Sequence, residues 1–160
     1  MPQRSAGLLL VRRRPGLEVF IAHLGGPFWA RKTEGAWSIP KGEVGPGEDD
    51  AAAARREFAE EIGTAPPEGA VADLGEVRSA SGKVVHVFAV EVDDFAVERV
   101  ASNEFELEWP PRSGRVQRFP EIDGAGWFGL DAARPLLSAG QRAALDLVGQ
   151  RFGNEGLSTP

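Results

Sequence analysis

One amphipathic helix, preceded by a loop rich in glycine and proline, constrains this sequence more than any other feature. Residues 42–64 read GEVGPGEDDAAAARREFAEEIGT. The composition predicts a helix from about Glu48 to Ile62, because four consecutive alanines favour helix and Gly63 is a suitable C-terminal stop. Apolar residues form one stripe of this helix and acidic residues form a separate one.

The acidic stripe is a candidate metal site. Glu57, Glu60 and Glu61 fall within roughly 100° of one another on a helical wheel. Carboxylates this close repel one another unless a cation lies between them, and Mg²⁺ commonly joins carboxylates to substrate phosphates. Arg56 lies beside Glu60, where it can hold a carboxylate by charge-assisted hydrogen bonds. The simplest alternative is a solvated acidic surface, the usual state of a Glu-Glu pair on a helix.

Composition excludes several classes of protein. The chain has 160 residues, of which 42% are hydrophobic and 26% charged, as expected for a single globular domain. No apolar run approaches the roughly 20 residues of a membrane span, and the N-terminal run is too short for a signal peptide. The absence of cysteine excludes disulfides and thiolate metal sites. We therefore expect a cytoplasmic protein with no membrane partner.

The net charge of −6 bears on the kind of partner. A broad grip on duplex nucleic acid needs a basic face, so we expect no such partner. Small phosphorylated substrates remain compatible with the charge, because a bound metal ion can invert the local potential.

The rest of the chain predicts a mixed α/β domain. Strands are expected at 5–12, 17–24, 37–39, 72–78, 83–92, 104–109 and 126–128, and helical segments at 131–137 and 141–152. The first two strands should pair as a hairpin. Residues 41–47 and 110–125 are expected to be irregular because they are rich in glycine and proline. We expect one domain over residues 1–152 and a flexible tail over 153–160.

The helix also belongs to a longer pattern of fixed spacing. Gly42 is followed after five residues by Glu48, and after seven more by residues 56–63, which read REFAEEIG. This pattern resembles the Nudix signature, in which glycine, five residues, glutamate and seven residues precede REUXEEXGU, with U a bulky aliphatic residue. Seven fixed positions match, and chance agreement at a given start is on the order of 10⁻⁸ to 10⁻⁹. Phe58 and Thr64 depart from the aliphatic U but keep apolar or β-branched character.

The resemblance implies a Nudix-type α/β/α sandwich around a mixed β-sheet, and a loop–helix–loop motif that binds Mg²⁺ or Mn²⁺. The residues that match the family's metal ligands are Glu57, Glu60, Glu61 and Gly42. Gly42 is implied as a tight-turn residue whose carbonyl faces the metal, and Arg56 as the salt-bridge partner that orients the carboxylates. Glu48 is expected to organise the loop at the start of the helix rather than to bind metal directly.

The implied activity is metal-dependent hydrolysis of a P–O–P linkage in a nucleoside diphosphate joined to another group. The chain lacks a GxxxxGK[ST] loop, which excludes a P-loop NTPase. Residues 38–48, SIPKGEVGPGE, are also similar to Nudix members that cleave dinucleoside polyphosphates, so we favour these or nucleoside triphosphates as substrates. Nucleotide sugars, ADP-ribose, diphosphoinositol phosphates and capped RNA remain alternatives, as does a non-catalytic nucleotide sensor. The general base, the number of metal ions and the oligomeric state stay open.

Residues outside the motif supply further candidates, each with a plainer alternative. Candidates for substrate binding are Lys41, Arg112, Arg115, Arg118 and Glu121, with solubilising surface charge as the alternative. Candidates for a further ligand or a general base are Glu104, Glu106, Glu108, Glu121 and Asp123. For His23 and His86 we favour hydrogen-bonded strand residues. Because the chain has no tyrosine, a base must stack on phenylalanine or tryptophan. The candidates for stacking are Phe28, Trp29, Trp37 and Phe105.

Overall fold

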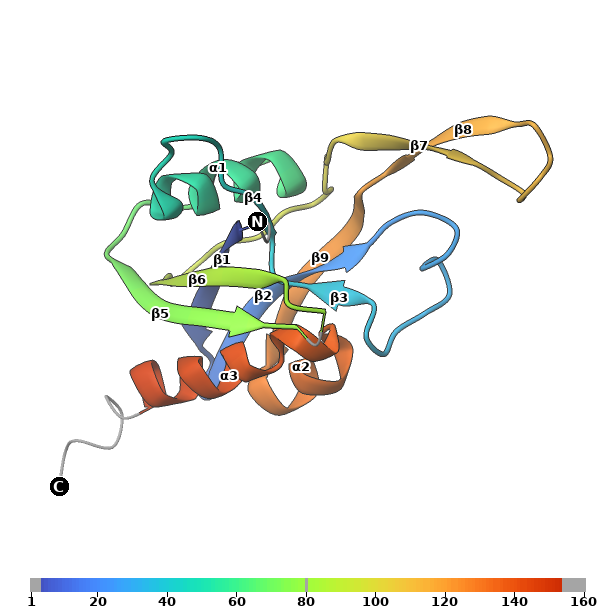
Figure 1. Ribbon diagram of the computed structural model, residues 1–160. Helices are drawn as coiled ribbons and strands as arrows, with labels where there is room; N and C mark the ends of the chain where they lie inside the picture. Colours follow the sequence, from blue (N-terminus) through green and yellow to red (C-terminus); the bar gives the residue numbers. More distant parts are fainter. Residues whose placement is uncertain (1–3, 80, 154–160) are drawn as a thin grey trace, which may run out of the picture.

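The computed structural model describes residues 4–79 and 81–153, which form a three-layered domain with a projecting hairpin (Figure 1). A seven-stranded mixed sheet forms the middle layer. Helix α1 (Asp50–Ile62) covers one face, and α2 (Leu130–Leu136) and α3 (Ala143–Val148) cover the other. The expected α/β/α sandwich is therefore confirmed.

The sheet is built around strand β1, which pairs along both edges. The strands of the main sheet are β1 (Arg4–Arg13), β2 (Leu17–Leu24), β3 (Trp37–Ser38), β4 (Lys41–Glu43), β5 (Val71–Arg78), β6 (Val84–Glu91) and β9 (Ile122–Gly129). Their order is β3-β2-β1-β6-β5, with β4 also paired to β1 and β9 to β2. Only β1 and β6 are parallel among the described pairs, and β1 and β2 form the expected hairpin.

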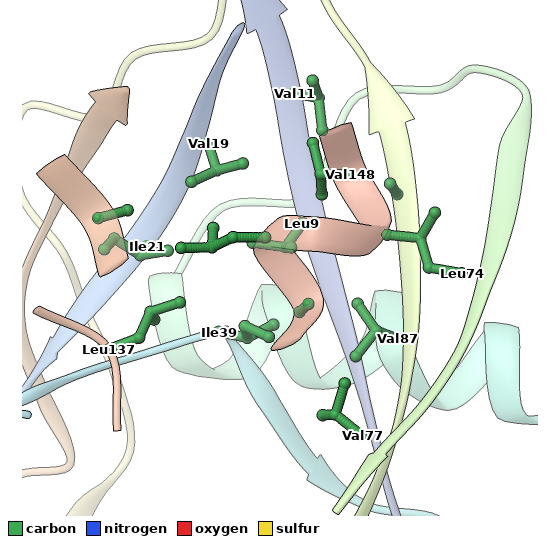
Figure 2. Close-up of a cluster of buried hydrophobic side chains, with 14 of the residues drawn as sticks. Leu9, Val11, Val19, Ile21, Ile39, Leu74, Val77, Val87, Leu137 and Val148 are labelled. Atoms are coloured by element: carbon green, nitrogen blue, oxygen red, sulfur yellow. The ribbon is translucent and has the colours of Figure 1, made fainter. Parts of the chain in front are cut away.

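Strand β1 is buried on both faces and separates two hydrophobic cores, because successive side chains of a strand point to opposite faces. Leu8 and Leu10 pack with Phe58 of α1. Leu9 and Val11 point the other way, into the core that α2 and α3 cover (Figure 2). The sheet thereby provides a rigid support for helix α1, which carries the acidic stripe.

Helix α1 begins at Asp50, two residues later than expected, because Asp49 caps it. The Asp49 carboxylate accepts a hydrogen bond from the N–H of Ala52 at 3.0 Å. At the other end Gly63 has a φ of 86° and donates its N–H to the carbonyl of Ala59 at 2.8 Å, as expected for a C-terminal glycine. Glu48 consequently lies in the loop before the helix.

Two segments that were expected to be irregular contain strands. Residues 41–43 form β4, since Gly42 pairs with Ala6 at the start of β1. In the later segment, β8 (Val116–Pro120) pairs antiparallel with β7 (Glu104–Glu108), so residues 104–120 form a hairpin that projects from the body (Figure 1). Both expectations were wrong because strand pairing, rather than glycine and proline content, decides these short strands: β4 pairs with the distant β1, and β8 with the neighbouring β7.

The C-terminal elements follow the expected pattern with local changes. Helix α2 has Gly129 at its N-cap and begins at Leu130, one residue before the expected start. The segment expected to be helical from residue 141 divides into a 3-10 turn η1 (Ala139–Gln141), α3, and a π-helical turn η2 (Gly149–Gly153). Its buried apolar side consists of Ala144, Leu145, Val148 and Phe152. Of the expected tail only residue 153 is described, and the domain limits stay a prediction. No helix in residues 4–79 and 81–153 is both long and apolar enough to cross a membrane.

His86 ties the first turn of α1 to the sheet. Its Nδ1 lies 2.7 Å from the carboxylate of Asp50, and its Nε2 lies 2.8 Å from that of Asp73 on β5. Burial disfavours the charged ring, but the two carboxylates outweigh it and raise the pKa of His86 above 6.5. The hydrogen bonds from His86 in turn lower the pKa values of Asp50 and Asp73. Arg4 also contacts Asp50, so the expected hydrogen-bonded role of this histidine is confirmed.

This network predicts a pH-dependent stability. Because the native pKa of His86 is raised, its contribution is complete below pH 6.5 and is lost as the pH rises through the native pKa. The contributions of Asp50 and Asp73 are present above pH 3.8 and are lost as the pH falls through their lowered values. His86→Gln should lower the free energy of unfolding by about 1–3 kcal/mol at pH 6. Urea unfolding at pH 6 and pH 8 measures this difference, and a variant that kept the wild-type pH dependence would contradict the assignment.

Candidate active site

Arg56 connects the loop before α1 to the acidic stripe of the helix. Its Nε and Nη2 donate to both carboxylate oxygens of Glu48, at 2.8 and 2.9 Å. Nη2 also donates to the backbone carbonyl of Glu43 at 3.0 Å. The remaining nitrogen, Nη1, donates to Glu57 at 2.8 Å and to Glu60 at 3.2 Å. The planar fork of arginine suits this arrangement, because a lysine offers no two-pronged geometry.

Glu48 holds the loop together from within. Besides Arg56, its carboxylate accepts a hydrogen bond from the N–H of Gly45 at 2.9 Å. These contacts with Arg56 and Gly45 lower the pKa of Glu48 to about 2, so it stays ionised. Such contacts support the predicted role of Glu48 in organising the loop.

Gly42 brings the backbone of β4 against the side chain of Glu57. A Cβ added to Gly42 would overlap the Glu57 carboxylate. The expectation that Gly42 forms a tight turn was wrong, since it lies within a strand and outside the left-handed φ region. This position requires glycine because the absence of a side chain leaves room for the Glu57 carboxylate.

Two carboxylates of the stripe are partly withdrawn from water. The Glu57 side chain is 15% exposed, and burial is the main cause of its raised pKa. Burial raises the pKa of Glu61 to about 7, although Glu61 accepts a hydrogen bond from the N–H of Lys41 at 2.9 Å. The nearby negative charge of Glu121 contributes to both shifts. Glu60 differs, since its side chain is 41% exposed.

The donor set matches a hard divalent cation in kind, although its present arrangement does not enclose one. Among the described residues, no three acidic or histidine side chains are gathered closely enough to hold an ion. The reason is that Glu57 and Glu60 both turn toward Arg56. The raised pKa values of Glu57 and Glu61 reflect poorly compensated negative charge, which a cation would relieve. Glu57 and Glu61, joined by Glu60 after rotation, are therefore the residues that would hold it.

Two small cavities share two lysines, and the smaller is also lined by Gly42, whose backbone meets the side chain of Glu57. One has a volume of about 240 Å³ and the other about 210 Å³, and Lys41 and Lys83 line both. The larger is also lined by the side chains of Ser79 and Ser81. A hollow of about 570 Å³ lies elsewhere, beside the start of α2, and Asp131 is its only ionisable lining residue.

Sequence reasoning did not single out Lys83, because its position depends on strand pairing. Lys41 lies opposite Gly7 on one edge of β1, and Val84, the residue after Lys83, lies opposite Arg4 on the other edge. The two lysines are 42 positions apart in the chain, and no local pattern connects them. The pairing of β1 with both β4 and β6 brings them to the same end of the sheet.

The other candidates are divided between the cluster and the hairpin. Glu121 lies between β8 and β9, where its charge acts on Glu57 and Glu61. Asp123 instead contacts His23 at 2.6 Å, and the other ring nitrogen of His23 lies 2.8 Å from the carbonyl of Lys32. The candidates that lie on the hairpin, and not in the cluster, are Glu104, Glu106, Glu108, Arg112, Arg115 and Arg118.

Comparison with known proteins decides the family. Residues 1–148 match the family profile of the NUDIX domain. The chain belongs to the Nudix family. The expectation of an enzyme of the Nudix pyrophosphohydrolase class is thereby confirmed at the level of the family. No curated protein matches the sequence at a significant level.

Solved structures share the fold of this Nudix protein at low sequence identity. A C. elegans Ap4A hydrolase binary complex has 21% identity and a TM-score of 0.64, covering 95% of this chain and 98% of the other. The NUDIX domain of Shewanella oneidensis NrtR, complexed with ADP ribose, has 15% identity and a TM-score of 0.65, covering 95% and 89%. A mutT/nudix family protein from Listeria innocua has 18% identity and a TM-score of 0.66, covering 99% of each chain. At these identities the likeness establishes the fold alone.

The contact between Gly42 and Glu57 yields a direct test. Gly42→Ala should displace the Glu57 carboxylate and lower the free energy of unfolding by about 1–3 kcal/mol, because the added methyl group has no space. Gly16→Ala is the matched control, since nothing lies within 4 Å of a Cβ at that position. Chemical denaturation of both variants measures the difference. Equal stability of the two variants would contradict the close approach.

Proposed function

We propose that this Nudix protein hydrolyses a P–O–P linkage in a nucleoside diphosphate joined to another group, with a dinucleoside polyphosphate or a nucleoside triphosphate as the substrate. The observation that carries the proposal is the partial burial of Glu57 and Glu61 against Gly42 and Lys41 of β4, two residues that line a cavity together with Lys83. A polyphosphate carries several negative charges, and a cation held by the carboxylates together with the two lysines would neutralise them.

The chain's own residues divide the chemical work. Glu57, Glu60 and Glu61 would hold Mg²⁺ or Mn²⁺, which supplies neutralisation of the diphosphate charge and polarisation of its P–O bonds. Arg56 keeps Glu57 and Glu60 close to β4, the strand that carries Gly42. We assign Glu121 as the carboxylate that accepts the proton of the attacking water, because it lies near the cluster but outside α1.

The two lysines bind and orient the phosphates in this proposal. Neither the Lys41 nor the Lys83 side chain has a carboxylate within ion-pair distance among the described residues, so both are available to an anion. Ser79 and Ser81 line the larger cavity, and their hydroxyl groups hydrogen-bond to each other at 2.8 Å, which leaves one O–H able to donate to a phosphate. This array favours a substrate with more than one phosphate on the lysine side of the cluster.

A substrate panel tests the proposal. The purified protein is incubated with Mg²⁺ and dinucleoside polyphosphates, nucleoside triphosphates, ADP-ribose or nucleotide sugars, and the products are identified. Turnover of the first two classes is expected. Activity confined to ADP-ribose or sugar nucleotides would contradict the substrate choice, and tight nucleotide binding without turnover under any divalent ion would favour a sensor.

The acidic stripe should be essential for turnover, and its negative charge should lower the stability of the metal-free protein. Glu61→Gln and Glu57→Gln should each lower kcat on the order of 100-fold or more, because each removes a charged oxygen donor. Glu61→Gln should also raise the melting temperature of the metal-free protein by a few degrees, since burying an amide costs less than burying an unpaired charge. Steady-state kinetics and thermal melts in EDTA measure both effects. Wild-type turnover in both variants would rule out the site.

Lys83 should act on substrate binding rather than on the fold. Lys83→Ala should raise KM roughly 10-fold or more, the loss expected for a charge-assisted hydrogen bond to phosphate. Lys83→Arg should recover most of the affinity, and Arg99→Ala serves as a control because Arg99 is exposed and lines neither cavity. An unchanged KM in Lys83→Ala would remove this lysine from the proposed site.

A further inference from the structure

The hairpin formed by β7 and β8 is an arm that the main sheet does not support. In the described chain its strands pair only with each other, and it projects beyond the seven-stranded sheet (Figure 1). An isolated two-stranded hairpin is marginally stable in water. Its persistence therefore depends on contacts near its base, where it leaves the body of the protein.

Two successive glycines bring the loop of residues 25–36 against the base of the arm. A Cβ on Gly25 would overlap the carbonyl of Pro120, and a Cβ on Gly26 would overlap the ring of Phe105. The N–H of Gly25 also donates to the carbonyl of Glu121 at 2.8 Å. The loop and the arm are thus packed together where the chain passes Glu121.

The face of the arm that meets the loop is apolar. Residues that lie directly opposite in an antiparallel pair share a face, so Phe105 and Phe119 lie together, with ring centroids 6.1 Å apart. The opposite face carries the acidic side chains of β7 and the exposed Val116. The apolar face is the one that Phe105 directs toward Gly26.

The loop itself carries an exposed aromatic pair. Phe28 is 58% exposed, and its ring packs edge-on against Trp29 with centroids 4.8 Å apart. The ammonium group of Lys32 lies 3.5 Å from the Phe28 ring centroid. Aromatic side chains with nearby cations are typical of surfaces on which nucleobases stack.

The charges around this surface suit a polyphosphate. Arg112 and Arg115 at the tip of the arm have exposed side chains without a carboxylate partner in the part of the chain that is described, as has Arg31 in the loop. In a protein of net charge −6, such cations are available to an anionic ligand. The surface is also continuous with the carboxylate cluster, because Glu121 borders both.

We propose that the loop of residues 25–36 and the apolar face of the arm form the subsite for the nucleobase of the substrate, with Phe28 as the ring on which the base stacks. This inference rests on the proposed function, since it places the base on one side of the carboxylate cluster and the lysine-lined cavities on the phosphate side. It also assigns the arm a role in selecting nucleotides over bare polyphosphates.

The test compares a ligand that carries bases with one that lacks them. KM is measured for diadenosine tetraphosphate, and the inhibition constant is measured for inorganic tripolyphosphate, in the wild type and in Phe28→Ala. Phe28→Ala should raise KM about 10-fold, the loss expected for one stacked base, and leave kcat and the tripolyphosphate inhibition constant unchanged. Phe28→Tyr should restore KM. Val116→Ala is the matched control, because Val116 is 63% exposed on the opposite face of the arm and should have no effect.

Two further measurements separate this inference from its alternatives. If the wild type hydrolyses no nucleotide, the proposed function fails, and the affinity for AMP then tests the base subsite alone: about 10-fold weaker binding to Phe28→Ala supports it. An equal effect of Phe28→Ala on ligands with and without a base, or no effect on either, overturns it. The remaining alternative is that this surface is a contact between copies of this chain. Sedimentation of the wild type and of Phe28→Ala tests it: a change of oligomeric state with an unchanged KM would also overturn the proposal.

Discussion

A single guanidinium group holds together the parts of the protein from which the candidate site is made. Arg56 binds both oxygens of Glu48, the carbonyl of Glu43 and the carboxylates of Glu57 and Glu60. The loop before α1 has few apolar side chains to pack, so these charge-assisted hydrogen bonds supply the order that a core supplies elsewhere. The acidic stripe keeps its position on the helix because the same arginine neutralises part of its charge.

Close backbone approach is the second constraint, and glycine makes it feasible. At Gly42 the missing side chain admits the Glu57 carboxylate, and at Gly25 and Gly26 it admits the base of the projecting arm. At Gly42 the approach withdraws the Glu57 carboxylate from water, and its side chain is only 15% exposed. The raised pKa of Glu61 reports the same loss of water at the centre of the cluster. A site of this kind is prepared for a cation and an anionic ligand that neutralise each other.

The features that sequence could predict are those with a local period or a fixed spacing. The helix, its acidic stripe and its glycine stop follow from residues 42–64, and only the start of the helix differs, because Glu48 precedes the N-cap at Asp49. The strand β4 was not predicted because it depends on a partner far away in the chain, and β8 was not predicted because the glycine and proline of residues 110–120 indicated a loop. Lys83 was missed because only the pairing along β1 brings it close to Lys41.

The central claim is that the acidic stripe of α1 binds a divalent cation. Crystals soaked in Mn²⁺ and measured at the manganese absorption edge test it most directly. The account predicts an anomalous peak among Glu57, Glu60 and Glu61, with Glu57 and Glu60 rotated away from Arg56 and with Arg56 still bound to Glu48. An anomalous map without a peak there, with both side chains still turned toward Arg56 at saturating Mn²⁺, would contradict it.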